Sequence, residues 1–148
     1  MAAVAHSLSR DVYWLLRNTT STLKNDLRKQ IEAHGISWPQ FHALYHIGEQ
    51  GIPANELARE LHCNASNMTG LVDRMIENGW VYREHSARDR RVWLVKLTEE
   101  GEQLKERLFP LHRQNIERRM SCLSGEELAL LAKLLRKLAD QDSGREQS

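Results

Sequence analysis

Residues 55–101 carry the pattern that most constrains the fold of this chain of 148 residues. Two short amphipathic segments precede two runs rich in β-branched and aromatic residues, 80–83 and 92–97, which read as strands. Between the runs lies the polar sequence Ser-Ala-Arg-Asp-Arg-Arg at 86–91, which suits a hairpin tip. The pattern predicts two helices joined by a turn and followed by a charged two-stranded hairpin.

The helix pair has clear local signals. Leu57, Ala58 and Leu61 would face inward from the first helix, Asn64 is a good N-cap for the second, and Gly79 would end it. The apolar positions of the second helix recur at helical spacing and should face the core: Met68, Leu71, Val72, Met75 and Ile76. The positions left to face outward are Ala65, Ser66, Asn67, Thr69, Gly70 and Arg74.

Longer helices are predicted on both sides of this region. Apolar residues at helical spacing predict one N-terminal helix ending near residues 34–35: Leu8, Val12, Leu15, Leu16, Leu23, Leu27 and Ile31. Ser37 can cap a short helix, and Thr98 a longer one that Pro110 should kink. Ser124 and Glu127 form a capping box for a last, leucine-rich helix. These leucine-rich faces favour a symmetric dimer over packing on their own small core.

The net charge of +1 does not by itself indicate a nucleic-acid binder. The hairpin does, because five basic residues lie between 83 and 96 against two acidic ones, Glu84 and Asp89. A solvated surface hairpin is the alternative reading of such a charge run. The adjacent helix pair favours DNA, since one helix can enter a groove while arginines of the ribbon contact the flanking backbone.

Four motifs, in order and at matching spacing, give the chain a resemblance to the winged helix-turn-helix of the multiple-antibiotic-resistance regulator (MarR) family. They are Leu-Val-Asp-Arg-Met at 71–75, Gly-Trp-Val at 79–81, Asp-Arg-Arg at 89–91 and Val-Lys-Leu-Thr-Glu-Glu-Gly at 95–101. The resemblance implies a mainly α fold with a small β-hairpin wing.

In domain terms the resemblance implies a single domain over residues 1–148. It would hold a DNA-binding region at 38–98 and dimerisation helices at 8–34 and 99–140.

The second helix of a helix-turn-helix presents its N-terminal residues to the base edges of the major groove. The candidates for base contacts are therefore Ser66, Asn67 and Thr69. Arg74 could reach a phosphate or could instead pair with Asp73 or Glu77 on the surface. Both alternatives remain open from the sequence.

The wing has a different task, because an arginine inserted in the minor groove reads its width more than its sequence. By resemblance, Arg91 matches the wing-tip arginine of the family and Asp89 the acid that holds it. Arg88 and Arg90 would add phosphate contacts. An ordinary turn residue is the alternative role for Asp89.

The function implied is a regulator of transcription that binds a palindromic double-stranded DNA site as a homodimer. Repression released by a small aromatic or lipophilic effector is the family's usual mode. An effector site in the crevice beside the dimerisation helices would use Tyr13, Trp14, Trp38, Phe41 and Tyr45, with His42 and Arg17 or Arg10 for an acid group. The alternative is that these rings fill the core.

Other classes of function are less well supported. The sequence has no phosphate loop, zinc-type cysteine spacing or nucleophile motif, so we expect neither an enzyme nor a cofactor. His42, His46 and His112 leave a metal-responsive regulator open, although we assign no metal site. A redox-responsive regulator is a further alternative, but we expect both cysteines to be structural. A helical protein-interaction module that does not bind DNA is the remaining rival.

The sequence has no apolar run of about 20 residues and no basic, apolar start at residues 1–10. We therefore expect a cytoplasmic protein without a membrane partner.

Overall fold

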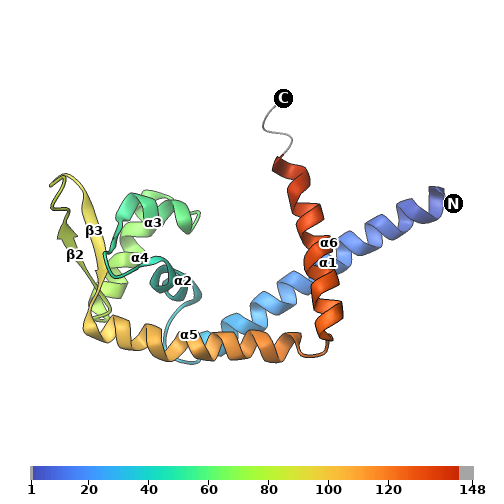
Figure 1. The fold of residues 1–148 in the computed structure, drawn as a ribbon. Coiled ribbons are helices and arrows are strands. Elements are labelled where there is room, and N and C mark those ends of the chain that lie inside the picture. Colours follow the sequence, from blue (N-terminus) through green and yellow to red (C-terminus); the bar gives the residue numbers. More distant parts are fainter. Residues whose placement is uncertain (1, 144–148) are drawn as a thin grey trace. The chain divides into compact units, whose positions relative to one another are not determined.

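The structure, a computed structural model, describes residues 2–143 (Figure 1). Its helices are α1 (Ala2–Glu32), α2 (Trp38–His46), α3 (Ala54–Glu60), α4 (Ala65–Glu77), α5 (Glu99–Met120) and α6 (Gly125–Ser143). Its strands are β1 (Ile52–Pro53), β2 (Val81–His85) and β3 (Trp93–Leu97). The chain divides within α5 into two compact units, one ending at Asn115 and the other beginning at Ile116. The predicted fold class, mainly helical with a small β wing, is confirmed.

The sheet has one strand more than the predicted hairpin. Its order is β1-β3-β2, and both neighbouring pairs are antiparallel. In β2–β3, Val81 pairs with Leu97 and His85 with Trp93, so the hairpin matches the predicted runs to within a few residues. β1 was not predicted, because two residues are too few to show alternation and one of them is a proline.

The first unit surrounds one apolar core. α2 begins with a capping box in which Gln40 N–H donates to Ser37 Oγ at 3.3 Å and Ser37 N–H to Gln40 Oε1 at 2.9 Å. The buried apolar face of α4 is Met68, Leu71, Val72 and Met75, as predicted, while Ile76 and Leu61 are only half-buried. The largest fully buried side chains are Ile31, Leu44, Ile47, Leu57, Val72, Met75, Val81, Val95 and Leu108.

The junction between β3 and α5 explains the sequence Leu-Thr-Glu-Glu-Gly at 97–101. Thr98 caps α5 by accepting a hydrogen bond from Gly101 N–H at 3.0 Å, and its hydroxyl donates to the Gly79 carbonyl. Gly79 has a φ of +79°, which lets the chain turn from α4 into β2. A Cβ on Gly101 would lie 2.0 Å from the Trp80 carbonyl oxygen, so only glycine permits this approach.

Large apolar side chains remain exposed on the N-terminal half of α1. They are Val4, Leu8, Val12, Tyr13, Trp14, Leu15 and Leu16, each at least 38% exposed. Of the apolar residues that predicted this helix, only Ile31, at its C-terminal end, is fully buried. An apolar surface of this extent on a single chain is typical of a protein interface.

The second unit shows the same feature on α6. Its predicted capping box is present, with Glu127 N–H donating to Ser124 Oγ at 3.2 Å and Ser124 N–H to Glu127 Oε1 at 3.0 Å. Exposed leucines follow along the helix: Leu130, Leu134, Leu135 and Leu138. α6 runs to Ser143, past the predicted end at 140, and residues 144–148 lie outside the described part of the chain. α5 continues on both sides of Pro110.

Within residues 2–143, no helix is both long enough and apolar enough to cross a bilayer.

Candidate nucleic-acid interface

α3 and α4 form the helix-turn-helix. The turn between them includes His62 in the left-handed region, with a φ of 52°, and Cys63, whose N–H donates to the Ala58 carbonyl at 3.0 Å. Asn64 then caps α4, because its Oδ1 accepts from Asn67 N–H at 2.8 Å. Cys63 is half-buried in this turn, which agrees with the structural role expected for it.

The three predicted base-contacting side chains are all exposed on the first turns of α4. Ser66 Oγ donates to Asn64 Oδ1 at 2.9 Å, and Thr69 Oγ1 donates to the Ala65 carbonyl at 2.9 Å. Each hydroxyl therefore donates its proton to a neighbouring residue of the same chain. Its oxygen remains exposed and can accept a hydrogen bond from DNA. The Asn67 side chain makes no hydrogen bond with any described residue, so its donors and acceptor are free.

Arg74 is exposed and makes no ion pair with any residue between 2 and 143. Its guanidinium lies back along the helix, 3.6 Å from the point that a Cβ on Gly70 would occupy. Asp73 is engaged elsewhere, because Arg83 Nη2 donates to Asp73 Oδ1 at 2.7 Å. The structure therefore does not show the predicted alternative in which Arg74 pairs with Asp73 or Glu77.

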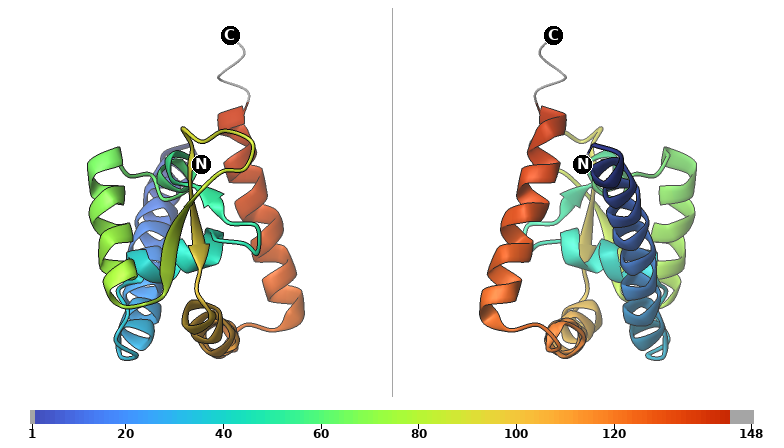
Figure 2. Two further views of the ribbon diagram at one scale, coloured as in Figure 1. Left: turned by 90° about the vertical axis from the view of Figure 1, so that its left-hand side faces the viewer. Right: turned by 90° about the vertical axis from the view of Figure 1, so that its right-hand side faces the viewer.

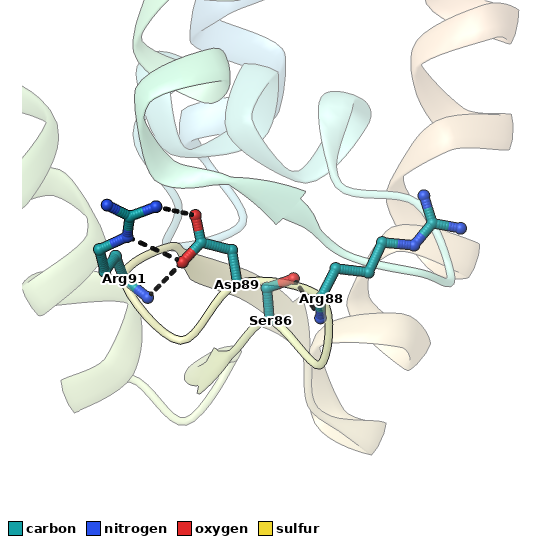
Figure 3. Close-up of polar contacts among 4 residues, drawn as sticks. All are labelled: Ser86, Arg88, Asp89 and Arg91. Atoms are coloured by element: carbon teal, nitrogen blue, oxygen red, sulfur yellow. Dashed lines mark hydrogen bonds and ion pairs between the residues drawn. The ribbon is translucent and has the colours of Figure 1, made fainter.

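The wing tip holds Asp89 and Arg91 together through three hydrogen bonds (Figure 3). Arg91 donates to Asp89 Oδ1 from its backbone N–H at 3.0 Å and from Nε at 3.1 Å, and to Oδ2 from Nη2 at 3.4 Å. The guanidinium of Arg91, followed by its backbone N–H, holds the pKa of Asp89 below its usual value. The Arg91 side chain is nevertheless 90% exposed, so it is oriented and open to solvent at once.

The other two wing-tip arginines are less constrained. The Arg88 N–H donates to Ser86 Oγ at 3.3 Å, while its guanidinium extends away from Asp89 (Figure 3). Arg90 is exposed beside them.

Away from the tip, the two basic residues of the hairpin strands are neutralised by acidic partners. Arg83 is paired with Asp73, and Lys96 Nζ lies 2.6 Å from Glu84 Oε2. The positive charge of the wing therefore concentrates at its tip.

α4 lies beside the hairpin (Figure 2), and the residues that join the wing to it were not predicted. Arg83 and His85 alternate on one face of β2, and Trp93 pairs with His85 across the ladder. The Trp93 and His85 rings are 3.6 Å apart between centroids, and Trp93 is 45% exposed. Period-two spacing from the buried Val81 would have placed Arg83 and His85 on the face toward α4.

The predicted effector residues fall into two groups. Tyr13, Trp14 and Arg17 form an exposed cluster on α1, with Arg17 5.4 Å above the Trp14 ring. Trp38, Phe41, His42 and Tyr45 lie on α2 and join Phe109 and His112 of α5 in a network of ring contacts.

The α1 residue whose charge acts on His42 is Lys24. Tyr13 is eleven residues earlier, or about 16 Å along the helix axis. One chain thus does not bring the two groups into a single site.

The histidines form no metal site that the structure shows. Residues 2–143 contain no group of three or more His, Cys, Asp or Glu side chains that could hold a metal ion. His46 instead lies 3.9 Å from Glu60. Burial, followed by the charges of His46, His112 and Lys24, lowers the pKa of His42, and burial lowers that of His112.

Two further features bear on the remaining predictions. Cys122 is exposed on the single chain, and its structural role stays a prediction. A cleft of about 440 Å³ lies beside α5, lined in part by Ile47, Leu97 and Phe109, and it contains none of the predicted effector residues. Lys105 donates to the Ile47 carbonyl at 2.9 Å in this cleft, where burial lowers its pKa.

Comparison with known proteins gives consistent similarities. Residues 36–93 match the MarR family. The uncharacterized HTH-type transcriptional regulator YpoP of Bacillus subtilis is 30% identical over 129 residues, which cover 86% of this chain and 91% of that protein. The transcriptional repressor MprA of Escherichia coli is 29% identical over 136 residues, 90% of this chain and 77% of MprA. A MarR family protein structure from Bacillus stearothermophilus has a TM-score of 0.77 at 29% identity, covering 93% of this chain and 97% of that one.

Proposed function

The chain belongs to the MarR family of winged helix-turn-helix transcriptional regulators, and we propose that it binds its operator chiefly through Asn67 of α4 and Arg91 of the wing tip. Family membership makes the protein a DNA-binding transcriptional regulator, and we propose no enzymatic activity for it. Because its relative MprA is a repressor, we propose repression as its mode of action in the cytoplasm.

The observation that carries the proposal is the geometry of the wing tip. Asp89 holds Arg91 in one orientation through three hydrogen bonds, yet leaves its side chain 90% exposed. A preorganised, solvent-exposed guanidinium suits insertion into a narrow minor groove, where the negative potential is strongest. Arg88 and Arg90 would reach the phosphates on either side, and Arg74 a phosphate near α4.

Base reading falls to the first turns of α4. The free amide of Asn67 can bond adenine in bidentate fashion through N6 and N7. Ser66 and Thr69 have used their hydroxyl protons within the helix, so they can accept from adenine N6 or cytosine N4. α4 has no Lys or Arg in its first half, so strong guanine recognition is not expected from it.

We propose a homodimer on a palindromic site, with DNA-binding residues 38–98 flanked by dimerisation helices at 8–34 and 99–140. The exposed apolar side chains of α1 and of α6 support it, because each face would otherwise remain in water. Two-fold symmetry would match half-sites one helical turn apart, about 34–36 Å. Sedimentation that finds a stable, DNA-competent monomer would exclude this part of the proposal.

The test of DNA recognition is selection of fragments from a random pool by the purified protein, followed by affinity measurements over a salt series. The logarithm of affinity should fall with the logarithm of salt by about 0.9 for each phosphate neutralised. A protein that retains no fragment even at low salt would instead act as a helical protein-interaction module.

We further propose that a small aromatic or lipophilic effector releases the DNA by binding at Trp38, Phe41, His42 and Tyr45. The supporting observation is His112 Nδ1, which is buried among these rings and has no hydrogen-bond partner in residues 2–143. An effector hydroxyl could donate to it. Tyr13 and Arg17 would join this site only from the second protomer.

A panel of phenols and aromatic carboxylic acids should contain compounds that lower DNA affinity in the wild type and fail in Trp38→Ala. Release by a chelator or by peroxide would favour the metal- or redox-responsive alternatives.

A further inference from the structure

A groove of about 410 Å³ separates the helix-turn-helix from the wing. Its helical side includes Asn55 of α3 and both Ala65 and Thr69 of α4, and its opposite side includes Trp93. The Asp73–Arg83 ion pair, at 2.7 Å, links α4 to β2 across it. The groove is thus continuous with the outward face of α4, where the proposed base contacts lie.

Trp93 is a large apolar side chain that lines this groove and is not covered by the rest of the fold. Its neighbour on the same face of β3, Val95, is fully buried, whereas Trp93 is 45% exposed. His85 packs against one side of the indole with 3.6 Å between ring centroids. The indole N–H makes no hydrogen bond with any described residue. The result is a supported ring with one free donor.

The shape of a DNA duplex indicates what would lie in the groove. The major and minor grooves are separated by a sugar–phosphate strand, so a protein that places α4 in one and its wing tip in the other must straddle that strand. The floor of the groove is apolar, because Ala54 and the buried side chains of Ala58, Met68 and Val72 line it. The exposed Trp93 ring suits a deoxyribose, and its free N–H suits a phosphate oxygen.

We propose that Trp93, supported by His85, contacts the DNA backbone between the two grooves. This inference rests on the proposed function. The ring packs on a deoxyribose and the indole Nε1–H donates to the adjoining phosphate. Such a contact fixes the register of the protein on the duplex without reading sequence.

Trp93→Phe and Trp93→Ala test the assignment, with Tyr82→Ala as the matched control. Tyr82 is 43% exposed on the same hairpin but on the opposite face of the sheet. Losing one hydrogen bond to a charged group should weaken binding about tenfold in Trp93→Phe, and further in Trp93→Ala. The loss should be equal for all single-base variants of the operator, and Tyr82→Ala should bind like wild type.

Two readouts separate this contact from the wing-tip arginine. An uncharged donor displaces no counterion, so the salt slope should stay that of wild type in Trp93→Phe. The change in tryptophan fluorescence on DNA binding should shrink in Trp93→Phe. Far-UV circular dichroism checks that each variant is folded.

Wild-type affinity in both Trp93 variants would overturn this inference while leaving the proposed function intact. A loss confined to one base position would also overturn it, since the residue would then read sequence. If the wild-type protein binds no DNA, the proposed function and this inference both fail.

Discussion

Replacing Gly101 by alanine should destabilise the protein severely, although it adds a single methyl group. The new Cβ would lie 2.0 Å from the Trp80 carbonyl oxygen and 2.9 Å from its carbon, against about 3.4 Å for ordinary contact. Both neighbours are backbone atoms, so the first turn of α5 must move away from Trp80. That movement would lengthen the hydrogen bond from Thr98 N–H to the Trp80 carbonyl, now 3.0 Å. Overpacking with loss of a partly buried hydrogen bond should cost about 2–4 kcal/mol.

Urea denaturation at fixed protein concentration measures this cost, and Gly125→Ala provides the control. Gly125 is also near the start of a helix, but a Cβ there meets nothing within 4 Å. Its free energy of unfolding should change by less than about 0.5 kcal/mol. If Gly101→Ala were also within about 1 kcal/mol of wild type, the close approach of α5 to Trp80 would not be what requires glycine.

The remaining predictions concern DNA binding and pH. Arg91→Ala should weaken sites with A·T-rich flanks and lower the salt slope by about one phosphate equivalent, whereas Asp89→Ala should do the same more mildly. An unchanged affinity and slope in a folded Arg91→Ala protein would remove the wing from the interface. Asn67→Ala should cost about 1–3 kcal/mol at one half-site position and relax specificity there, which competition against single-base variants measures. Because burial lowers the pKa values of His42 and His112 from 6.5, the unfolded chain binds more protons just below pH 6.5. Stability should therefore be full above pH 6.5 and fall as the pH drops toward the lowered values. The double variant His42→Asn, His112→Asn should show a flatter dependence in urea melts, and an equally steep one would contradict the argument.

Features that depend on neighbouring residues in the chain could be predicted well. Ser37, Asn64 and Ser124 each cap a helix as expected, because a capping side chain bonds backbone only two or three residues away. The buried face of α4 followed from periodicity for the same reason. The pairing of Asp89 with Arg91 was expected from the family resemblance, and two residues of separation make it a local contact.

Contacts between distant segments could not be predicted in this way. Arg83 and Lys96 were counted among the basic residues expected to face DNA. The fold instead pairs Arg83 with Asp73 and Lys96 with Glu84. Whether a wing cation is free or paired depends on which element packs beside it. Periodicity says which way a side chain points but does not identify the residue opposite.

The sequence by itself determined the order of the helices and of the two hairpin strands, the caps at Ser37, Asn64 and Ser124, and the charged wing tip, since each depends on short-range hydrogen bonds or on periodicity. Only the tertiary structure decided which segments distant in the sequence lie against one another. It added β1 to the hairpin and packed the His85 ring against Trp93 beside a groove. It also separated Tyr13 from Trp38, because α1 is a rigid helix of 31 residues and α2 packs beside its C-terminal part. Distances of this kind arise from packing in three dimensions, which a one-dimensional pattern does not contain.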